Sequence, residues 1–320
     1  MKKKKKKIKR KYMSEFGLHT FSSYVEICYP LDLKSLTFEH DYHIYMINLI
    51  PKLSFNKLSL KVFEDYVSID VNIKTEVSSR SVNIPFTLAP NVNHKELNIS
   101  IDRPSKTLTM LNNEGDGAEI RVLSLIQFAR IWLDTEILYI GQSYGKKGER
   151  KAIDRLISHN TLQKIQSDFV FDPPERDLAI TFFEFTPRLM ASFDGITKEF
   201  EKNDKEDLIH FNNIMGNEPL KLSKPMISIT EAALINYFKP PYNQKFRDNF
   251  PRLSHGSYKQ YYDLDYNALT VELDPDAIRT NFFSENQKYN TFKAIKYTLH
   301  SEEHRRSMFD FFTKDNSEVN

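Results

Sequence analysis

The sequence has few of the residues that build covalent cross-links and phosphate-binding loops. Its 320 residues include one cysteine, Cys28, and only 9 glycines. A single cysteine cannot form an intramolecular disulfide or a cysteine-rich zinc site, so the chain depends on its hydrophobic core and suits a reducing cytosol. It also has no glycine-rich loop of the P-loop or dinucleotide-binding type, which argues against a nucleotide-driven enzyme.

Long apolar runs are missing as well. Nowhere do about eighteen apolar residues follow one another, and the lysines at the start are not followed by the apolar stretch of a signal peptide. Hydrophobic residues nevertheless make up 40% of the chain, which is enough to fill the core of one large domain or two smaller ones. These features predict a soluble, cytoplasmic protein with no membrane association.

Charge is unevenly distributed along the chain. The net charge of +2 is the balance between nine lysines and arginines within residues 2–11 and an excess of acidic residues in the remainder. A run of like charges repels itself, so we expect residues 1–14 to be a disordered, solubilising tail. The same tail can attract phosphate groups without reading a sequence.

Residues 15–118 are predicted to form a β-rich N-terminal domain. Runs with a period of two, such as YHIYMINLI and SVNIPFTL, alternate with polar turns, and NNEGDG has the composition of a linker. A second domain is expected over 119–250. The strands and helix predicted over 251–320 can pack back on the N-terminal domain.

The second domain is predicted to belong to the α+β class. VLSLIQFARIWLD and EILYIGQ are interpreted as a β-hairpin that turns at Asp134-Thr135, and ERKAIDRLISHNTLQKI as an amphipathic helix. The strand DLAITFFEF follows, and then an insertion at about 190–225 with a helix around DLIHFNNIM. A last helix, in SITEAALINYF, ends at Pro240-Pro241. This order predicts a small antiparallel β-sheet flanked by helices.

The order of these elements, together with certain residues, resembles the GIY-YIG nuclease family over about residues 122–247. The triplet Tyr-Ile-Gly at 139–141 matches the second half of the family signature. The other matching positions, in chain order and with similar spacing, are Arg155, His159, Glu231 and Asn243.

The match to the family is incomplete. No literal Gly-Ile-Tyr precedes the triplet, and counting back across the predicted turn places residues 126–128 opposite it, so Phe128 would pair with Gly141. Phenylalanine lacks the hydroxyl group that the family often has there. Gln142 stands where some members carry lysine, and the basic loop YGKKGERK lengthens the connection to Arg155.

The resemblance implies a metal-dependent endonuclease that hydrolyses phosphodiester bonds in DNA, with Mg²⁺ or Mn²⁺ as cofactor. Glu231 would supply a hard oxygen ligand for the metal. Arg155 would hold a phosphate with its planar guanidinium group, and Tyr139 and His159 would position water and move protons. Asn243 would organise the site.

These assignments have alternatives. Ser228 and Glu231 form the S-x-x-E pattern of a capping box, so the carboxylate could serve a helix end, although Glu231 shares a helical face with Leu234 and Phe238, which directs it inward. For the whole domain, the alternative is a catalytically inactive GIY-YIG-like module that binds nucleic acid or protein. The pattern H-x-x-E-H at 300–304 matches inverted zinc peptidases, but little chain follows it to supply a third ligand.

Overall fold

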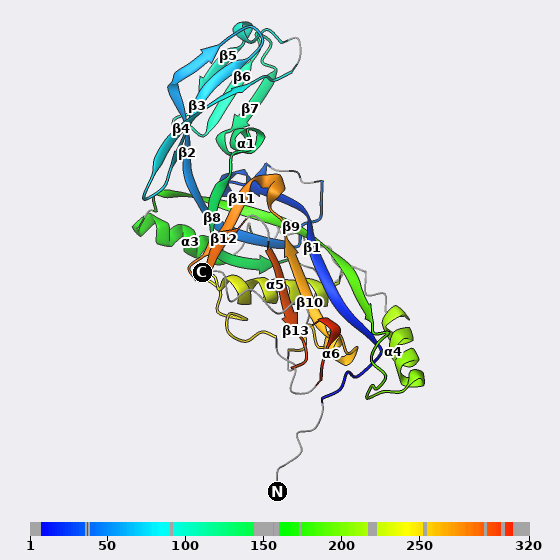
Figure 1. Ribbon diagram of the computed structural model, residues 1–320. Helices are drawn as coiled ribbons and strands as arrows, with labels where there is room; N and C mark the ends of the chain where they lie inside the picture. Colours follow the sequence, from blue (N-terminus) through cyan, green and yellow to red (C-terminus); the bar gives the residue numbers. More distant parts are fainter. Residues whose placement is uncertain are drawn as a thin grey trace.

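A large mixed β-sheet forms the body of the protein (Figure 1). The computed structural model describes residues 8–35, 37, 39–89, 92–143, 156, 160–172, 174–216, 223–251, 255–290, 293–301 and 305–309. Eight strands of the sheet follow one another in the order β12-β11-β8-β2-β9-β1-β10-β13, and β3 and β4 extend it from β2. Their bounds are β1 (Ser14–Cys28), β2 (Ile44–Val62), β3 (Val67–Lys74), β4 (Ser79–Phe86), β8 (Leu133–Gln142), β9 (Arg176–Phe193), β10 (Ala268–Leu273), β11 (Thr280–Ser284), β12 (Gln287–Asn290) and β13 (Lys293–Thr298).

The predicted fold class, an α+β protein with a small antiparallel sheet flanked by helices, is wrong. Strands from all three predicted regions pair with one another, so the described protein is mostly β. β2 lies between β8 and β9, and β1 lies between β9 and β10. Local patterns identified many of these strands, but the sequence carried no local signal for pairing between strands so far apart.

Helices cover both faces of the central strands. On one face α5 (Lys224–Phe238) buries an apolar stretch against Phe16, Met46 and Phe183. On the other face α3 (Asn160–Phe171) packs Leu162 and Ile165 against a second apolar cluster. Strands buried on both faces need apolar residues at successive positions, which explains the continuous apolar run in the middle of β9.

The predicted β-hairpin at Asp134-Thr135 is also wrong. VLSLIQF forms α1 (Val122–Phe128), which buries four residues at helical spacing, and Phe128 is 68% exposed at its end. Asp134 and Thr135 lie inside β8, where they pair with β11 in parallel. A short apolar run fits either a buried strand or a helix, and tertiary packing decided for the helix.

A distal lobe, residues 52–132, projects from the sheet at the top of Figure 1. It contains the far half of β2, the strands β3 and β4, α1 and a separate sheet of β5 (Asn98–Ile101), β6 (Thr107–Leu111) and β7 (Gly117–Arg121). Its own core includes Phe55, Val71, Met110 and Ile126. The lobe is inserted between β2 and β8, which are neighbours in the sheet.

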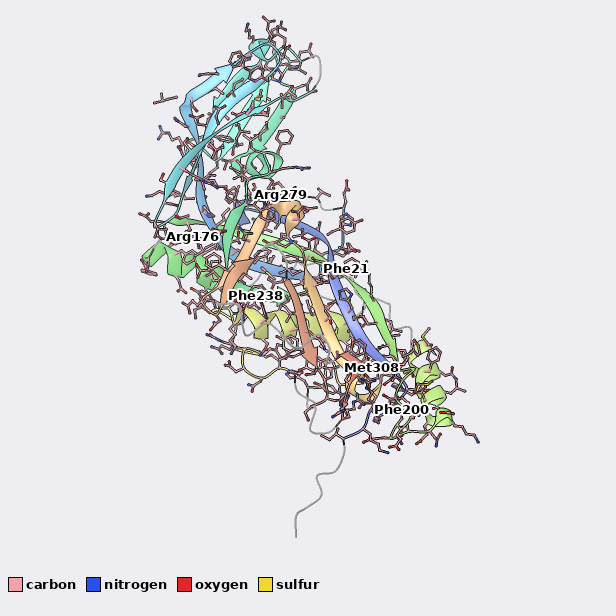
Figure 2. All side chains as sticks on the ribbon, in the orientation of Figure 1. Phe21, Arg176, Phe200, Phe238, Arg279 and Met308 are labelled. Atoms are coloured by element: carbon pink, nitrogen blue, oxygen red, sulfur yellow. The ribbon has the colours of Figure 1, made fainter. Side chains whose placement is uncertain are left out.

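Ion pairs fix the junction between the lobe and the body. Arg176, labelled in Figure 2, donates to the Glu136 carboxylate at 3.1 Å and lies 3.6 Å from that of Glu76. Lys106 of the lobe donates to the Asp177 carboxylate at the start of β9. Because these contacts join both parts, the distal lobe has a defined orientation on the sheet.

The insertion predicted at about 190–225 contains a helix, as expected. β9 runs on to Phe193, and DLIHFNNIM falls within α4 (Asp204–Gly216). Part of the predicted tail is ordered, because Lys11 is ion-paired with Asp265 and β1 begins at Ser14. In the predicted C-terminal helix, the described residues 305–309 form no α-helix.

A buried carboxylate ties the two ends of the chain to the body. Asp265, in the connection between α6 (Gln260–Asp263) and β10, accepts hydrogen bonds from Lys11 and, at 2.6 Å, from Arg305, and lies 3.2 Å from His300. Burial alone would raise the pKa of Asp265, but the His300 hydrogen bond and the Arg305 and Lys11 charges outweigh it and hold this pKa well below its usual range.

The substitution Asp265→Asn should lower the free energy of unfolding by about 3–5 kcal/mol at pH 7, because it removes the charge that compensates buried Arg305. Urea denaturation measures the loss. The folded-state pKa is depressed, so the stabilisation is present above the unfolded-state pKa of about 4 and disappears as the pH falls through the folded-state value. The matched control, Asp276→Asn, breaks an exposed pair with Arg279 and should cost at most about 1 kcal/mol. Equal losses in both variants would contradict this prediction.

Candidate active site

The Tyr-Ile-Gly triplet lies near the end of β8, beside the central strand β2. In the antiparallel ladder Gly141 pairs with Tyr45 and Tyr139 pairs with Ile47. A bulge at Leu138 shifts the register, so that Tyr139 packs toward the α3 side of the sheet while Ile140 faces α5. The triplet therefore presents its tyrosine and its isoleucine to opposite faces.

Gly141 allows two tyrosine rings to lie close together. A Cβ atom at this position would come within 2.6 Å of the Tyr45 ring and 2.8 Å of the Tyr139 ring, closer than real Cβ contacts. With glycine there, the centroids of the two rings are 6.2 Å apart. The glycine of the triplet is thus required by the close approach of side chains, and the two tyrosines form one aromatic pair.

Glu231 lies in the interior of α5 and points inward. Its side chain is buried, and its Oε2 accepts a hydrogen bond of 2.7 Å from the Gln142 side-chain amide. The same amide donates to the Ser228 hydroxyl at 3.1 Å. The N-cap of α5 is Ser223, whose side chain accepts a hydrogen bond from the Met226 backbone, so the capping-box interpretation of Glu231 is wrong.

Asn243 closes the free edge of β8. The neighbouring strand β11 pairs with β8 only as far as Glu136. Beyond that point Asn243 accepts a hydrogen bond from the Ile140 N–H and donates to the Ile140 carbonyl, both at 2.8 Å. The Tyr242 N–H also donates to the Leu138 carbonyl at 3.1 Å. A single side chain thereby imitates a strand partner and holds the triplet in place.

The candidate residues that the structure describes lie on both faces of the sheet near the end of β8. Gln142 and Glu231 are in contact on the α5 side, Tyr139 lies two residues earlier on the α3 side, and Asn243 lies along the strand edge. Arg155 and His159 lie outside the described residues, as does the basic loop YGKKGERK that precedes them.

One residue that the sequence analysis did not select belongs to this group. Tyr45 is fully buried on β2, opposite Gly141. The signal is the run His43-Ile44-Tyr45, which contains the Ile-Tyr of the family signature but falls within the predicted N-terminal domain, far from the triplet. Phe128, placed opposite Gly141 by the hairpin interpretation, lies instead at the end of α1.

A metal at this site would depend on few protein ligands. Among the residues that the structure describes, no group of three or more histidine, cysteine, aspartate or glutamate side chains is arranged to hold a metal ion. Glu231 is a single carboxylate and would leave most coordination positions to water and to substrate oxygens. Mg²⁺ commonly binds in this way, through one or two carboxylates and retained waters.

Comparisons with protein-family models, curated proteins and solved structures found no match. No helix within the described part of the chain is both long and apolar enough to span a bilayer.

The substitution Gly141→Ala should destabilise the protein by about 1–3 kcal/mol, because the new methyl group forces the Tyr45 and Tyr139 rings apart. Thermal or urea unfolding measures the change. Gly195→Ala is the matched control, since its Cβ would meet no atom within 4 Å, and should change stability by no more than about 0.5 kcal/mol. A wild-type stability for Gly141→Ala would show that the two rings can separate without cost.

Proposed function

We propose that this protein is a metal-dependent endonuclease that hydrolyses phosphodiester bonds in DNA, with a site similar to that of GIY-YIG nucleases. The observation that carries the proposal is the buried Glu231 carboxylate, held by Gln142 next to the end of the Tyr-Ile-Gly strand. An acidic side chain directed into the protein beside a strand end is unusual in a purely structural helix, because burying a charge is costly.

The order of elements along the chain supports the same proposal. β2 with Ile44-Tyr45, β8 with the Tyr-Ile-Gly triplet, α3, β9 and α5 occur in this order along the chain. β2 lies between β8 and β9 in the sheet and is antiparallel to both. The sequence of strand, strand, helix, strand and helix is the one that the resemblance implied, with the distal lobe inserted between the first two strands. His43 stands where the signature has its first glycine.

The residues divide the chemistry between them. Glu231 would hold Mg²⁺ or Mn²⁺, and the bound ion would take up negative charge on the phosphoryl oxygens. Arg155 would pair with the scissile phosphate as charge develops there. Tyr45, Tyr139 and His159 are the groups that can orient water and accept or return its proton. Asn243 fixes the backbone of the triplet through Ile140.

A second candidate function is a binding module with the same architecture and no catalysis. It is favoured by the substitution of glycine by histidine at position 43 and by the neutral Gln142 amide that contacts the carboxylate. In this alternative the Glu231–Gln142 hydrogen bond is a structural clasp between α5 and β8. Binding of DNA without cleavage would then be its activity.

We also propose a cytoplasmic location. Cys28 is the only cysteine and is buried. Burial, with smaller contributions from the nearby Asp32 and Glu26 carboxylates, raises the pKa of its thiol to about 12, so it stays protonated and unreactive. A protein with a single unreactive thiol cannot be stabilised by an intramolecular disulfide in an oxidising compartment.

The test is nicking of supercoiled plasmid DNA in the presence of Mg²⁺. We expect the wild type to cut, and Glu231→Gln and Arg155→Ala each to lose at least about a hundredfold in rate, because each removes charge stabilisation of the transition state. Tyr45→Phe keeps the ring and tests the hydroxyl group. Asp276→Asn changes an exposed carboxylate and should cut at the wild-type rate.

Chelation of divalent cations should abolish the cutting, and added Mg²⁺ should restore it. Cutting that persists in Glu231→Gln would overturn the assignment of the metal ligand. A wild type that binds DNA in a salt-dependent manner but never cuts would establish the second candidate function instead.

A further inference from the structure

The outer surface of the distal lobe carries an unusually uniform set of side chains. β2, β3 and β4 bury one face in the core of the lobe, with Phe55, Val71 and Ile84 among the buried residues. The opposite face, here called the polar face, is mostly polar, and the exposed Leu58 lies beside it where the register of β2 shifts between Asn56 and Lys61. The face consists of Lys52, Ser54, Asn56, Lys61, Ser68, Asp70, Asn72, Lys74, Ser79, Ser81, Asn83 and Pro85.

The strand register arranges these residues in rows across the three strands. One row is Asn56–Asp70–Asn83, and the next is Ser54–Asn72–Ser81. Lysines lie at the two ends of the face. Lys52 pairs with Lys74 in the row beyond Ser54, and Lys61 pairs with Ser68 at the other end. The centre of the face is therefore amide, hydroxyl and carboxylate, and its margins are cationic.

Hydrogen bonds between the side chains hold the centre of the polar face in a defined arrangement. Asn83 donates to Asp70 at 2.7 Å and accepts from the Ser68 hydroxyl at 2.9 Å. Ser81 donates to Asn72 at 3.0 Å. Asn83 and Ser81 are nevertheless exposed, so their donors and acceptors remain open to a partner. Pre-ordered polar groups of this kind lose little conformational entropy on binding.

The chemistry of the polar face matches the edges of base pairs. Asparagine can bond adenine through two contacts, serine can bond any base, and aspartate can accept from the amino group of cytosine. Lysines at the margins suit phosphate groups, which give affinity and fix the position of the protein. A protein partner is disfavoured, because protein interfaces are centred on aromatic and apolar anchors, whereas the centre of this face is polar and its apolar residues, Pro85 and the neighbouring Leu58, lie toward one end.

The dimensions also fit a duplex. At about 3.3 Å per residue, the polar centre from Ser68 to Asn72 is about 13 Å long, close to the width of about 12 Å of the major groove of B-DNA. With the strands lying across the groove, the lysines at either end would reach the two phosphate backbones.

β2 connects this face directly to the candidate active site. Lys52, Ser54 and Asn56 lie on the same continuous strand as Ile44 and Met46, which pack in the apolar cluster of α5. Asn56 follows Tyr45 by 11 residues on this strand. An extended strand of that length measures at most about 36 Å, which is one turn of B-DNA.

We propose that the polar face of β2, β3 and β4 binds DNA in the major groove and selects a sequence about one helical turn from the phosphate that is cut. The predicted distance between the selected sequence and the cut phosphate rests on the proposed nuclease function. Sequence-selective DNA binding by the polar face does not depend on cleavage.

The experiment is selection of bound duplexes from a random-sequence pool, using the full chain with Glu231→Gln so that bound DNA stays intact. We expect enrichment of a short motif. In the same background, Asn72→Ala with Asn83→Ala should reduce the preference for that motif over random DNA by about 10–100-fold, because two base-reading amides are lost. Asn98→Ala with Ser100→Ala, on the exposed side of β5 in the same lobe, is the matched control and should keep the preference. Unchanged melting temperatures verify that all variants are folded.

Cleavage of a duplex that contains the motif by the wild type then measures the spacing, and we expect cuts about 10 base pairs from it. The inference is overturned if no motif is enriched in the bound DNA, or if the preference for the motif is unchanged in the Asn72→Ala, Asn83→Ala variant. Either result counts against it even if the protein cuts DNA. A motif that depends on these two residues, in a protein that never cuts, supports the binding surface and rejects the nuclease function.

Discussion

The continuous backbone of β2 is the constraint on which the rest of the structure depends. Its first half pairs with β8 and β9 in the body, and its second half pairs with β3 in the distal lobe. Over residues 44–49 it has partners on both edges, and from Lys52 onward it pairs with β3, so the lobe and the candidate active site share one continuous strand. The contacts of Arg176 and Lys106 at the junction reinforce this coupling. Insertion of the lobe therefore leaves the pairing of Tyr45 with Gly141 intact.

Polar side chains at the end of β8 make the backbone hydrogen bonds that a neighbouring strand would otherwise make. Where β11 stops, Asn243 satisfies the backbone of Ile140, and Gln142 turns its amide toward α5. Buried backbone groups without partners are costly, so this edge could not be left open. Near the same strand end, the Glu231 carboxylate lies on the α5 face of the sheet and the Tyr45 and Tyr139 rings lie on the α3 face.

The sequence predicted individual strands and helices better than it predicted which strands pair in the sheet. The strand that carries Tyr139, the strand in DLAITFFEF, the helix α4 and the inward direction of Glu231 follow from local periodicity, and all four are present. The hairpin failed because a short apolar run fits a helix as well as a strand. The partner of the triplet, β2, lies some ninety residues earlier, and no local pattern reports a contact across an inserted lobe. The role of Tyr45 was therefore invisible until the sheet order was known.

The position of β1 in the sheet has a consequence for the way the chain is made. One edge of β1 pairs with β9, and the other pairs with β10, which is synthesised some 250 residues after it. Until then that edge exposes unpaired backbone groups, which invite pairing with other chains. Contacts this distant along the chain also slow folding, since a long loop must close before they form. A nascent chain that has not yet reached residue 268 therefore has an open sheet edge on β1 and is a natural substrate for chaperones.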